Sequence, residues 1–539
     1  MLNKNSLRNF LGELPFAAEL YDSIRKRRPN TRYNLEQLEK HLPLAVEQAR
    51  PFIASAKPGK KLLLFATLHY WIEQAAIIGL ALRGLGHDVT IAYLPYHDWR
   101  KDINKFDLRR QDLYTRRVLA PLKGLVNYAS LLDVQLASAL PATLPSDISL
   151  VSVYDSQYTD QIEDVDKNSA IYKLRQQRND FAARAALTLM QDLKPDTVLI
   201  PNGTITELGA VYRVARHLDL RTITYEFNDQ REQVWIAQDD EVMRQNTDLL
   251  WEARGGNKLT KPERALIDEL ESARMGGKAF GKSVRKWQDV ETKGGEELRK
   301  ELGLDKKRPV VLLATNVLGD SLTLGRNIFA RSMADWIEKT VQFFANQPQF
   351  QLVIRIHPGE RLTHGPSMSD VVKGALAEVP ENIHLIGPLE KVNTYDLMEI
   401  AALGLVYTTT TGLEMAMNGI PVVACGETHY RKRGFTLDPM SWDGYYALIE
   451  KALKSKKSLT KAQIETAWEY AYRFFFEYPL AFPWRLMHFW KDMEVSPMAH
   501  VLSDEGQKEF GKTFDYLAGE KLSSNLYGRG LPARNLKNG

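Results

Sequence analysis

The chain has almost no cysteine, since Cys425 is the only one among its 539 residues. A single thiol excludes an intrachain disulfide and every metal site that needs several cysteines. It also fits a reducing compartment, so we expect a cytoplasmic protein, with the inner face of the cytoplasmic membrane as one option. Long hydrophobic runs are absent as well. No stretch of about 18 uncharged apolar residues occurs, and the N-terminal residues hold no apolar core of signal-peptide length, so we expect no membrane span.

The chain also lacks an excess of charge of one sign. It has 71 basic and 67 acidic side chains, with a formal net charge of +4. This balance is too even to indicate a nucleic-acid partner. Hydrophobic residues at 44% and charged residues at 26% are typical of a globular protein. The length exceeds what one core usually supports, so two or three domains are expected.

Short apolar runs alternate with amphipathic stretches, which predicts parallel sheets covered by helices, the α/β class. In the first half we predict strands at residues 61–67, 87–93, 148–153, 197–200 and 221–226, with helices at 71–85, 172–193 and 207–217. In the second half we predict strands at 310–317, 350–356, 383–386, 404–407 and 421–425, with helices at 328–346, 393–401 and 412–418. Each half is therefore predicted to be Rossmann-like.

Changes in composition suggest five segments. We predict a helical N-terminal extension over residues 1–58 and a Rossmann-like domain over 59–253. Paired glycines between charged stretches mark an interdomain helical segment over 254–308, before a second Rossmann-like domain over 309–455. Residues 456–539 are predicted to form C-terminal helices and a tail, with loop structure over the last forty residues.

The second predicted domain contains the strongest functional pattern. One strand ends in Arg355-Ile356-His357-Pro358, and another ends in the four threonines of residues 408–411. A hydroxyl-rich turn that leads into a helix favours phosphate, because the free N–H groups and the helix dipole both attract anions. His357 is a candidate donor to a leaving phosphate, although a histidine at a strand end is often structural. Arg355 adds positive charge.

Several residues of this pattern have two readings. Thr410, Thr411 and Gly412 are candidates for phosphate contact, although threonine is also an ordinary helix N-cap. Glu414 is a candidate acceptor for ribose hydroxyls, or it complements the helix dipole. Arg431, in the basic run of residues 431–433, either clamps a leaving phosphate or lies in a solvated loop.

A second group follows the strand at 310–314. Asn316, Asp320 and Ser321 are predicted to lie on the same sheet edge as His357, where Asp320 would position a substrate hydroxyl or the donor. The alternative is a turn rich in side chains that bond to their own backbone. The turn Gly84-Leu85-Gly86 follows a helix and lacks the dinucleotide fingerprint, so a nicotinamide enzyme is not expected.

These motifs resemble the capsule-polysaccharide-biosynthesis glycosyltransferases, a group that includes bacterial Kdo transferases. The resemblance rests on the RIHP strand end, on Ala314-Thr315-Asn316-Val317 with Asp320-Ser321, and on TTTTGLEMAMNGIPVVACGETHYRKRGFT, and it covers residues 309–440. It implies a GT-B fold, with two Rossmann-like domains facing a cleft and the last helices returning to the first domain. His357, Pro358 and the threonine turn would contact the donor phosphate. The chain departs from the family where residues 429–434 replace a Gly-Trp-Gly-like element.

The resemblance also implies the reaction. The chain would transfer a sugar from a nucleotide-activated donor to a glycan or lipid-linked glycan acceptor of a surface polysaccharide. A CMP-sugar such as CMP-Kdo is favoured, and a UDP-sugar is the alternative. We expect no cofactor and no metal, because no strand end carries two aspartates flanking one residue. A non-hydrolysing nucleotide-sugar epimerase and a non-catalytic assembly scaffold remain alternatives. The aromatic stretch 468–490 either packs internally or associates peripherally with a membrane.

A sugar transfer needs a base for the acceptor hydroxyl, and we expect it in the first domain. Asp155 is the first candidate and Glu226 the second, each placed at the end of a predicted strand. Glu207 and His69 are further candidates. Each of these carboxylates also has an ordinary capping or surface explanation.

Overall fold

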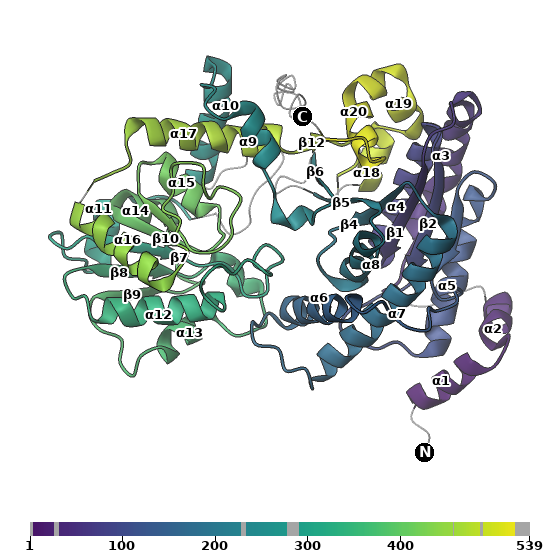
Figure 1. Cartoon of the computed structure of the whole chain (residues 1–539), viewed down its shortest axis with the longest axis horizontal. Helices are drawn as coiled ribbons and strands as arrows, with labels where there is room; N and C mark the ends of the chain where they lie inside the picture. The colour runs from purple at the N-terminus through teal and green to yellow at the C-terminus, as the bar shows by residue number, and fades with distance from the viewer. Residues whose placement is uncertain are drawn as a thin grey trace. The chain divides into compact units, whose positions relative to one another are not determined.

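The computed structural model describes residues 4–25, 32–227, 233–276, 290–455, 457–485 and 489–522. The chain forms two compact units (Figure 1). The first unit comprises Met1–Thr159, Val165–Met243 and Leu480–Leu522. The second comprises Asp160–Asp164 and Arg244–Pro479. The chain thus returns to the first unit at Leu480, as the family resemblance predicts.

The first unit contains helices on both sides of one sheet. Its strands are β1 (Lys61–Thr67), β2 (Asp88–Leu94), β3 (Asn127–Ser130), β4 (Thr197–Pro201), β5 (Arg221–Phe227), β6 (Gln233–Gln238) and β12 (Leu480–Ala481). Its helices are α1 (Lys4–Glu13), α2 (Ala17–Arg25), α3 (Glu36–Ser55), α4 (His69–Gly84), α5 (Lys105–Leu119), η1 (Ala120–Leu122), α6 (Leu144–Asp160), α7 (Ala170–Leu193), α8 (Thr206–His217), η2 (Val242–Arg244), α18 (Phe489–Val495), α19 (Met498–Leu502) and α20 (Asp504–Leu517).

The second unit has a smaller sheet. Its strands are β7 (Val310–Ala314), β8 (Gln351–Arg355), β9 (Ile383–Ile386), β10 (Ala401–Val406) and β11 (Val422–Ala424). Its helices are α9 (Asp248–Arg254), α10 (Lys261–Met275), α11 (Gly295–Glu301), α12 (Met333–Ala345), η3 (Pro358–Leu362), α13 (Met368–Gly374), α14 (Thr394–Ile400), α15 (Thr411–Met417), α16 (Trp442–Ser455), α17 (Lys461–Tyr472) and η4 (Arg473–Glu477), a turn of π-helix.

The two sheets share one strand order. The second unit reads β11-β10-β7-β8-β9, all parallel, and the first reads β12-β6-β5-β4-β1-β2-β3. The parallel part of each sheet has the doubly wound order in which the chain starts at the centre, builds outwards, and then continues on the other side. The order reverses between β1 and β4 in the first unit and between β7 and β10 in the second. Ligands of such sheets bind at the carboxyl ends of the strands beside the reversal. The predicted α/β class with two Rossmann-like sheets is confirmed.

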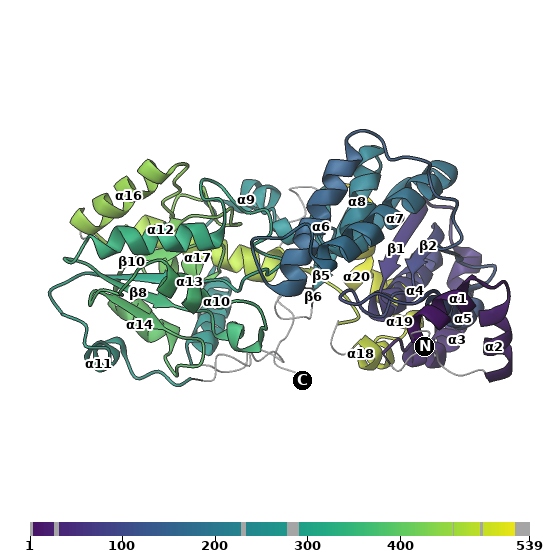
Figure 2. The same cartoon turned by 90° about the horizontal axis from the view of Figure 1, so that it is seen from below.

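The apolar core of the second unit lies on its parallel sheet, between the strands and the helices that cover them. Alternate residues of β7, β8 and β10 pack under α12 and α16, with Trp336 and Tyr445 fully buried between them. The indole N–H of Trp336 donates to the Tyr445 hydroxyl at 3.1 Å. In Figure 2, α12 and α16 cover one face of this sheet, and α14 and α11 cover the other. Both faces are covered, as expected for an all-parallel sheet of nearly continuous apolar strands.

The strand predicted at residues 148–153 is wrong, because this segment lies within α6. Its buried positions include Leu144, Ile148, Val151 and Asp155, which follow helical spacing. A short apolar run alone cannot separate the two periods. The prediction missed the edge strands β3 and β12, and β6 beside β12, because these strands are short or mixed in polarity. β6 and β12 also run antiparallel to their neighbours, outside the β-α-β pattern.

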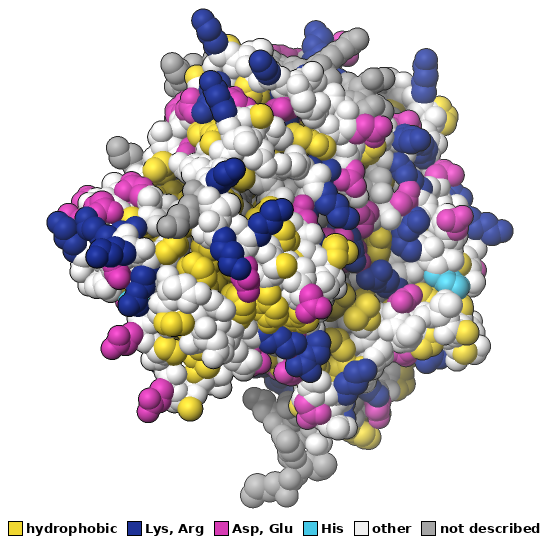
Figure 3. All heavy atoms as spheres, turned by 60° about the vertical axis from the view of Figure 1, so that its left-hand side comes forward, with side chains coloured by type: hydrophobic (Ala, Val, Ile, Leu, Met, Phe, Trp, Pro, Cys, Tyr) yellow, Lys and Arg dark blue, Asp and Glu magenta, His cyan; other side chains and the backbone are white. Residues whose placement is uncertain are grey.

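The C-terminal part of the chain differs from the prediction. Residues 504–517 form α20, against the loop predicted there, and residues 523–539 lie outside the described part of the chain. Within the described ranges, no helix has the length and apolar composition needed to cross a bilayer. On the face shown in Figure 3, basic and acidic side chains are interspersed, in keeping with the nearly even charge.

Candidate active site

Side-chain hydrogen bonds tie together three strand ends of the second unit. The Thr315 hydroxyl, just past β7, accepts from the backbone N–H of His357 at 2.9 Å, just past β8. The Asn316 side-chain oxygen accepts from the backbone N–H of Thr408 at 3.1 Å, just past β10. Asn316 is buried. It therefore spans the reversal of strand order between β7 and β10, where this fold binds its ligands.

The ring of His357 is fixed by the next turn of the chain. Its Nδ1 accepts a hydrogen bond from the backbone N–H of Gly359 at 3.0 Å. A ring nitrogen that accepts carries no proton, so in the neutral imidazole the proton lies on Nε2. A Cβ atom on residue 359 would lie 2.8 Å from that Nδ1, so this approach requires glycine. The local backbone thus makes Nε2 of His357 a hydrogen-bond donor.

The four threonines form a turn whose hydroxyls are only partly used. The Thr409 hydroxyl accepts from the backbone N–H of Thr411 at 3.3 Å and donates to the Thr411 hydroxyl at 3.1 Å. Thr410 stands at the N-cap position of α15, but its side chain makes no capping hydrogen bond. The plain N-cap reading therefore does not account for Thr410.

His357 and the threonine turn line a common cavity of about 90 Å³. This is smaller than the 300–1,000 Å³ of typical ligand sites, so it fits one group of a ligand rather than a whole nucleotide sugar. The predicted residues Arg355, Pro358, Thr410, Thr411 and Glu414 also line it. The remaining lining residues are Arg274, Val290, Val392, Asn393, Thr394, Tyr395, Met398 and Thr409.

Arg355 is buried and forms a wall of this cavity. Its guanidinium donates to the carbonyl oxygens of Gly387 at 2.7 Å and Val392 at 3.2 Å. Burial lowers the pKa of Arg355 to about 10, although Glu390 opposes the shift. Its Nε, also buried, has no hydrogen-bond partner among the described residues. Arg355 therefore orders the loop of residues 387–392, and with a pKa of about 10 it stays cationic at neutral pH in the wall of the cavity.

Glu414 has a partner that the sequence analysis missed. Its Oε1 accepts from Nη1 of Arg274 at 2.8 Å, and both side chains are buried. The Arg274 guanidinium also stacks on the ring of Phe475 at 4.2 Å. Burial, and then the charge of Glu414, raise the pKa of the neighbouring Glu271 to about 8. The ion pair with Arg274 explains Glu414 better than the helix dipole does.

Three other predicted binding residues have structural roles. The Arg431 guanidinium is buried and donates to the carbonyl oxygens of Ala424 at 2.5 Å and Pro439 at 3.0 Å, and burial lowers its pKa. Both the solvated-loop reading and the phosphate clamp are therefore wrong for Arg431. A Cβ on residue 412 would lie 2.4 Å from the Tyr430 hydroxyl, so Gly412 is required by packing. Pro358 begins η3 directly after His357.

Asp320 and Ser321 do not line the cavity. The Asp320 carboxylate accepts from the backbone N–H of Leu322 at 3.0 Å, and its carbonyl accepts from Thr323 N–H at 2.8 Å. This is the self-bonding turn that was the alternative reading for the segment. Of the three residues predicted after β7, only Asn316 joins the strand ends beside His357.

Asp155 does not lie at a strand end. It is in α6, fully buried, and accepts from Arg175 Nε at 3.1 Å, from Asn179 Nδ2 at 2.7 Å and from the backbone N–H of Thr206. Arg175 also donates to Glu207 at 2.8 Å. Burial raises the pKa of Asp155, and Arg175 opposes that shift. With no exposed carboxylate, Asp155 is a link between α6, α7 and α8, and its prediction as the acceptor base is wrong. The same burial applies to Glu207.

Glu226 and His69 do lie at the carboxyl edge of the first sheet. Glu226, near the end of β5, is half-buried, and its Oε2 accepts from Asn202 Nδ2 at 3.3 Å. Asn202 follows β4 with a φ of 59°. His69 opens α4 directly after β1; burial lowers its pKa, and its Nδ1 has no hydrogen-bond partner among the described residues. The structure thus gathers Glu226, Asn202 and His69 around the reversal between β1 and β4.

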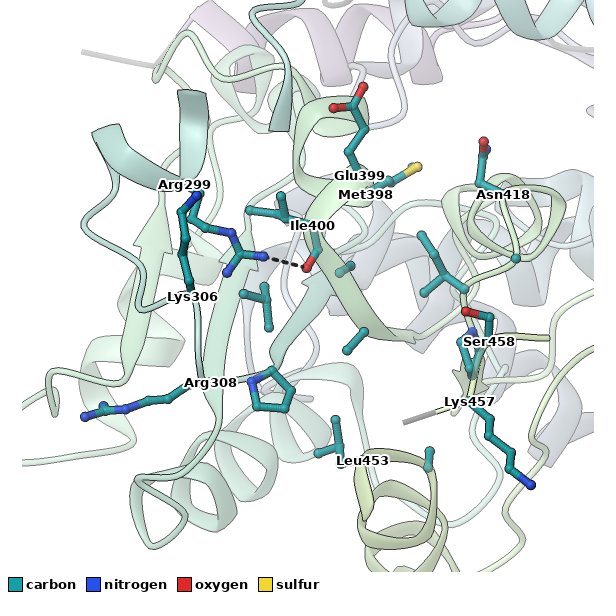
Figure 4. Close-up of a pocket in the computed structure, with 18 of the residues that line it drawn as sticks. Arg299, Lys306, Arg308, Met398, Glu399, Ile400, Asn418, Leu453, Lys457 and Ser458 are labelled. Atoms are coloured by element: carbon teal, nitrogen blue, oxygen red, sulfur yellow. Dashed lines mark hydrogen bonds between the residues drawn. The ribbon is translucent and has the colours of Figure 1, made fainter. Parts of the chain in front are cut away.

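A larger cavity, about 620 Å³, lies at the opposite edge of the second sheet, where β7 and β10 begin (Figure 4). Arg299 donates to the carbonyl of Ile400 at 3.5 Å, while Arg308 and Lys457 extend away from the middle of the cavity. Lys306 pairs with Glu296 at 2.6 Å. None of the sequence-predicted site residues lines this cavity.

Comparison with known proteins gives one family match. Residues 273–472 match the family described as capsule polysaccharide biosynthesis protein. No curated protein sequence matches the chain. The chain is similar to the solved structure of KpsC, beta Kdo 2,4 transferase, from Thermosulfurimonas dismutans, at 17% identity over 51% of this chain and 79% of that chain, with a TM-score of 0.33.

Two further solved structures are similar at the same low level. KpsC, beta Kdo 2,7 transferase, from the same organism is 11% identical over 58% of this chain and 88% of that one, with a TM-score of 0.32. UDP-GlcNAc 2-epimerase from Neisseria meningitidis, bound to UDP-GlcNAc, is 14% identical over 76% of this chain and 98% of that chain, with a TM-score of 0.25. The family match, in contrast, contains every residue that lines the His357 cavity. Residues 273–472 therefore match the model of the capsule polysaccharide biosynthesis family, the family that the sequence resemblance indicated.

Proposed function

We propose that this protein is a glycosyltransferase that moves a sugar from a nucleotide-activated donor to the acceptor glycan of a surface polysaccharide. The observation that carries the proposal is the imidazole of His357, which the Gly359 N–H fixes as an Nε2–H donor. It lines a cavity shared with the threonine turn, beside the reversal of strand order. Donors held at this position suit a phosphate group.

The chemistry follows from where charge develops. In the transfer, the acceptor oxygen bonds to the anomeric carbon while the bond from that carbon to the phosphate oxygen breaks. Negative charge grows on the departing phosphate, and its stabilisation by fixed donors lowers the barrier. Nε2–H of His357 and the hydroxyls of Thr410 and Thr411 serve as those donors. Asn316 holds the end of β10, and with it the threonine turn, in register with β7.

The acceptor hydroxyl loses its proton in the same step, and a base must take it. We assign this role to Glu226, whose carboxylate is half-buried, with Oε2 accepting from Asn202 Nδ2 and Oε1 accepting from the backbone N–H of Phe227. His69, at the same edge of the first sheet, is the second candidate. Asp155 and Glu207 share Arg175 in the interior of the first unit and are not available to a substrate.

The donor that we favour is a CMP-sugar such as CMP-Kdo, and a UDP-sugar is the alternative. This preference rests on the RIHP strand end and threonine turn that resemble the Kdo transferases, within the segment that matches the family model. The acceptor is a glycan or lipid-linked glycan of the capsular type. The protein acts in the cytoplasm, where nucleotide sugars are made available to such enzymes.

A nucleotide screen followed by a transfer assay tests the proposal. The full chain is heated with CMP, UDP, GDP or TDP, and a nucleotide at about 100 times its dissociation constant should stabilise the fold by about 2.7 kcal/mol. We expect CMP to raise the melting temperature most, and the matching sugar nucleotide to release its nucleotide only with a glycan acceptor. Conversion of the donor without acceptor would identify an epimerase instead. Stabilisation by none of the four nucleotides would favour the scaffold reading and contradict the proposal.

A further inference from the structure

The N-terminal helices expose an unusual amount of apolar surface. The described part of the chain exposes fifteen large hydrophobic side chains, and seven of them lie between residues 7 and 24. Phe16 is 76% exposed, Ile24 71% and Leu20 62%. Single exposed hydrophobic side chains are normal, whereas a concentration on one element marks an interaction surface.

These side chains form two rows. Leu7, Phe10 and Leu14 follow the spacing of one helical face in and directly after α1, and Phe16, Leu20 and Ile24 follow it in and before α2. We call these six residues the N-terminal apolar surface. Both helices pack on α5, on its outer side in Figure 1.

The side that α1 and α2 turn towards α5 consists mostly of small and charged residues, and Tyr21 adds one aromatic contact, to Phe106 at 5.6 Å between ring centres. Gly12 and Ala18 are buried there, and a Cβ on residue 12 would lie 2.4 Å from the backbone nitrogen of Phe106. The Arg109 guanidinium donates to the carbonyl oxygens of Gly12 at 2.9 Å and Leu14 at 2.8 Å. This close contact leaves no room for a larger side chain at residue 12.

Ion pairs complete that inner contact. Four of them link the first two helices to α5: Arg8–Asp107 at 2.6 Å, Glu13–Lys105 at 2.6 Å, Glu19–Arg109 at 2.6 Å and Asp22–Arg117 at 2.8 Å. An amphipathic helix of a globular protein normally turns its apolar stripe to the core and its charges to water. Here the arrangement is reversed, so the apolar stripe needs a partner outside the unit.

We infer that the N-terminal apolar surface docks on a lipid bilayer that contains anionic headgroups. Helices α1, α2 and α5 together contain eight basic and five acidic residues. A positive excess next to an apolar face is the composition of interfacial helices, which insert large apolar side chains while their cations attract anionic lipid. None of the described helices crosses a bilayer, so the contact is to the membrane surface. This inference is independent of the proposed function, because it concerns residues outside the matched family segment.

Vesicle flotation with the purified full chain tests the inference. One set of vesicles contains phosphatidylcholine alone, and the other contains about one third phosphatidylglycerol. We expect the wild type to float with the anionic vesicles, less so with the neutral ones, and less at high salt. Phe10→Glu combined with Phe16→Glu should lower binding to anionic vesicles about tenfold or more, since two aromatic side chains are lost from the apolar surface.

A matched control uses two other exposed hydrophobic residues of the same unit. Leu44 is 57% exposed and Val495 is 81% exposed. Leu44→Glu with Val495→Glu should bind vesicles as the wild type does, and both double variants should keep the wild-type melting temperature. Equal flotation of the two double variants would overturn the inference, as would a wild type that binds neither vesicle. If sedimentation instead shows a dimer that Phe10→Glu with Phe16→Glu dissociates, with no vesicle binding, a second copy of the chain is the partner and the membrane inference is wrong.

Discussion

The side chain of Asn316 accepts a hydrogen bond from the backbone N–H of Thr408 at 3.1 Å, across the reversal of strand order in the second unit. The bond joins the end of β7 to the turn that carries Thr410 and Thr411. It fixes the distance between the two segments that, with His357, supply the proposed phosphate donors. The hydrogen bond from the His357 N–H to the Thr315 hydroxyl likewise joins the end of β8 to the end of β7.

Asn316→Ala should lower nucleotide affinity as well as stability. The variant leaves the buried N–H of Thr408 without its acceptor, which costs about 1–3 kcal/mol. Asn382→Ala is the control, because Asn382 is also buried and donates to backbone carbonyls, including that of Phe344 at 2.9 Å. Both variants should melt earlier, and calorimetry should show a lower nucleotide affinity for Asn316→Ala alone. Equal affinities in the two variants would make Asn316 a purely structural residue.

Thr410→Val and Thr411→Val keep the side-chain volume but remove the hydroxyls. We expect nucleotide affinity to fall by about 1 kcal/mol for each lost hydrogen bond, roughly fivefold. Because the Thr410 side chain makes no capping bond, Thr410→Val should not change the melting temperature. Thr466→Val, at a half-buried position of α17, serves as the control for the substitution itself. An unchanged affinity with a lower melting temperature would identify the threonines as helix caps only.

Glu271 gives the second unit a predictable dependence on pH. Its pKa is raised from 4.5 to about 8 by burial and by Glu414, whereas Arg274 and Asn418 oppose the shift. Between these two values the folded protein binds more protons than the unfolded chain, so stability falls as pH rises through this window. Glu271→Gln removes the titrating group and should flatten that fall.

Denaturant melts of the wild type and Glu271→Gln at pH 5 and pH 8 measure this effect. Glu73 also has a pKa raised to about 8 by burial, so it contributes in the same direction in both proteins. The comparison therefore rests on the difference between the two proteins and not on the wild-type slope. If the wild type and Glu271→Gln lose the same free energy of unfolding between pH 5 and pH 8, Glu271 is already ionised in the folded protein. The effect of Glu414 and burial on its pKa would then be wrong.

Glu226→Gln and Asp155→Asn should separate a catalytic carboxylate from a structural one. Glu226→Gln should lower transfer by about 10²–10⁴, the usual contribution of a general base, with the melting temperature kept. Asp155→Asn should instead destabilise the first unit, because it weakens the buried contact with Arg175. Transfer rates and thermal melts of both variants provide the test. Normal transfer by Glu226→Gln would move the role to His69.

The sequence predicted the parts of the site that depend on neighbouring residues. The strand end at His357 and the threonine turn follow from short apolar runs that stop at polar or glycine residues, and β7 to β11 were placed within a few residues. The role of Nδ1 in His357 was not predictable, because it depends on the backbone direction of Gly359.

The predictions that failed concern residues whose contact partners are not evident from the neighbouring sequence. Arg274 was missed because its partner Glu414 is 140 residues away. Asp155 was predicted at a strand end because the apolar run before it was taken for a strand, and its burial was missed because it depends on Arg175 and on the backbone of Thr206. Arg431 was predicted to be a phosphate clamp or part of a solvated loop because its basic neighbours suggest a surface loop. Its hydrogen bonds to two carbonyl oxygens form only when the loop folds back.

The central claim is that Nε2–H of His357 stabilises the leaving phosphate, and single-turnover transfer by variants of this residue tests it most directly. His357→Ala should lower the transfer rate at saturating donor by about 10²–10³, while His357→Gln, which retains an N–H donor, should lose less. His384→Ala, on the neighbouring strand β9, is the control and should transfer at the wild-type rate. A His357→Ala protein that transfers sugar at the wild-type rate would contradict the account.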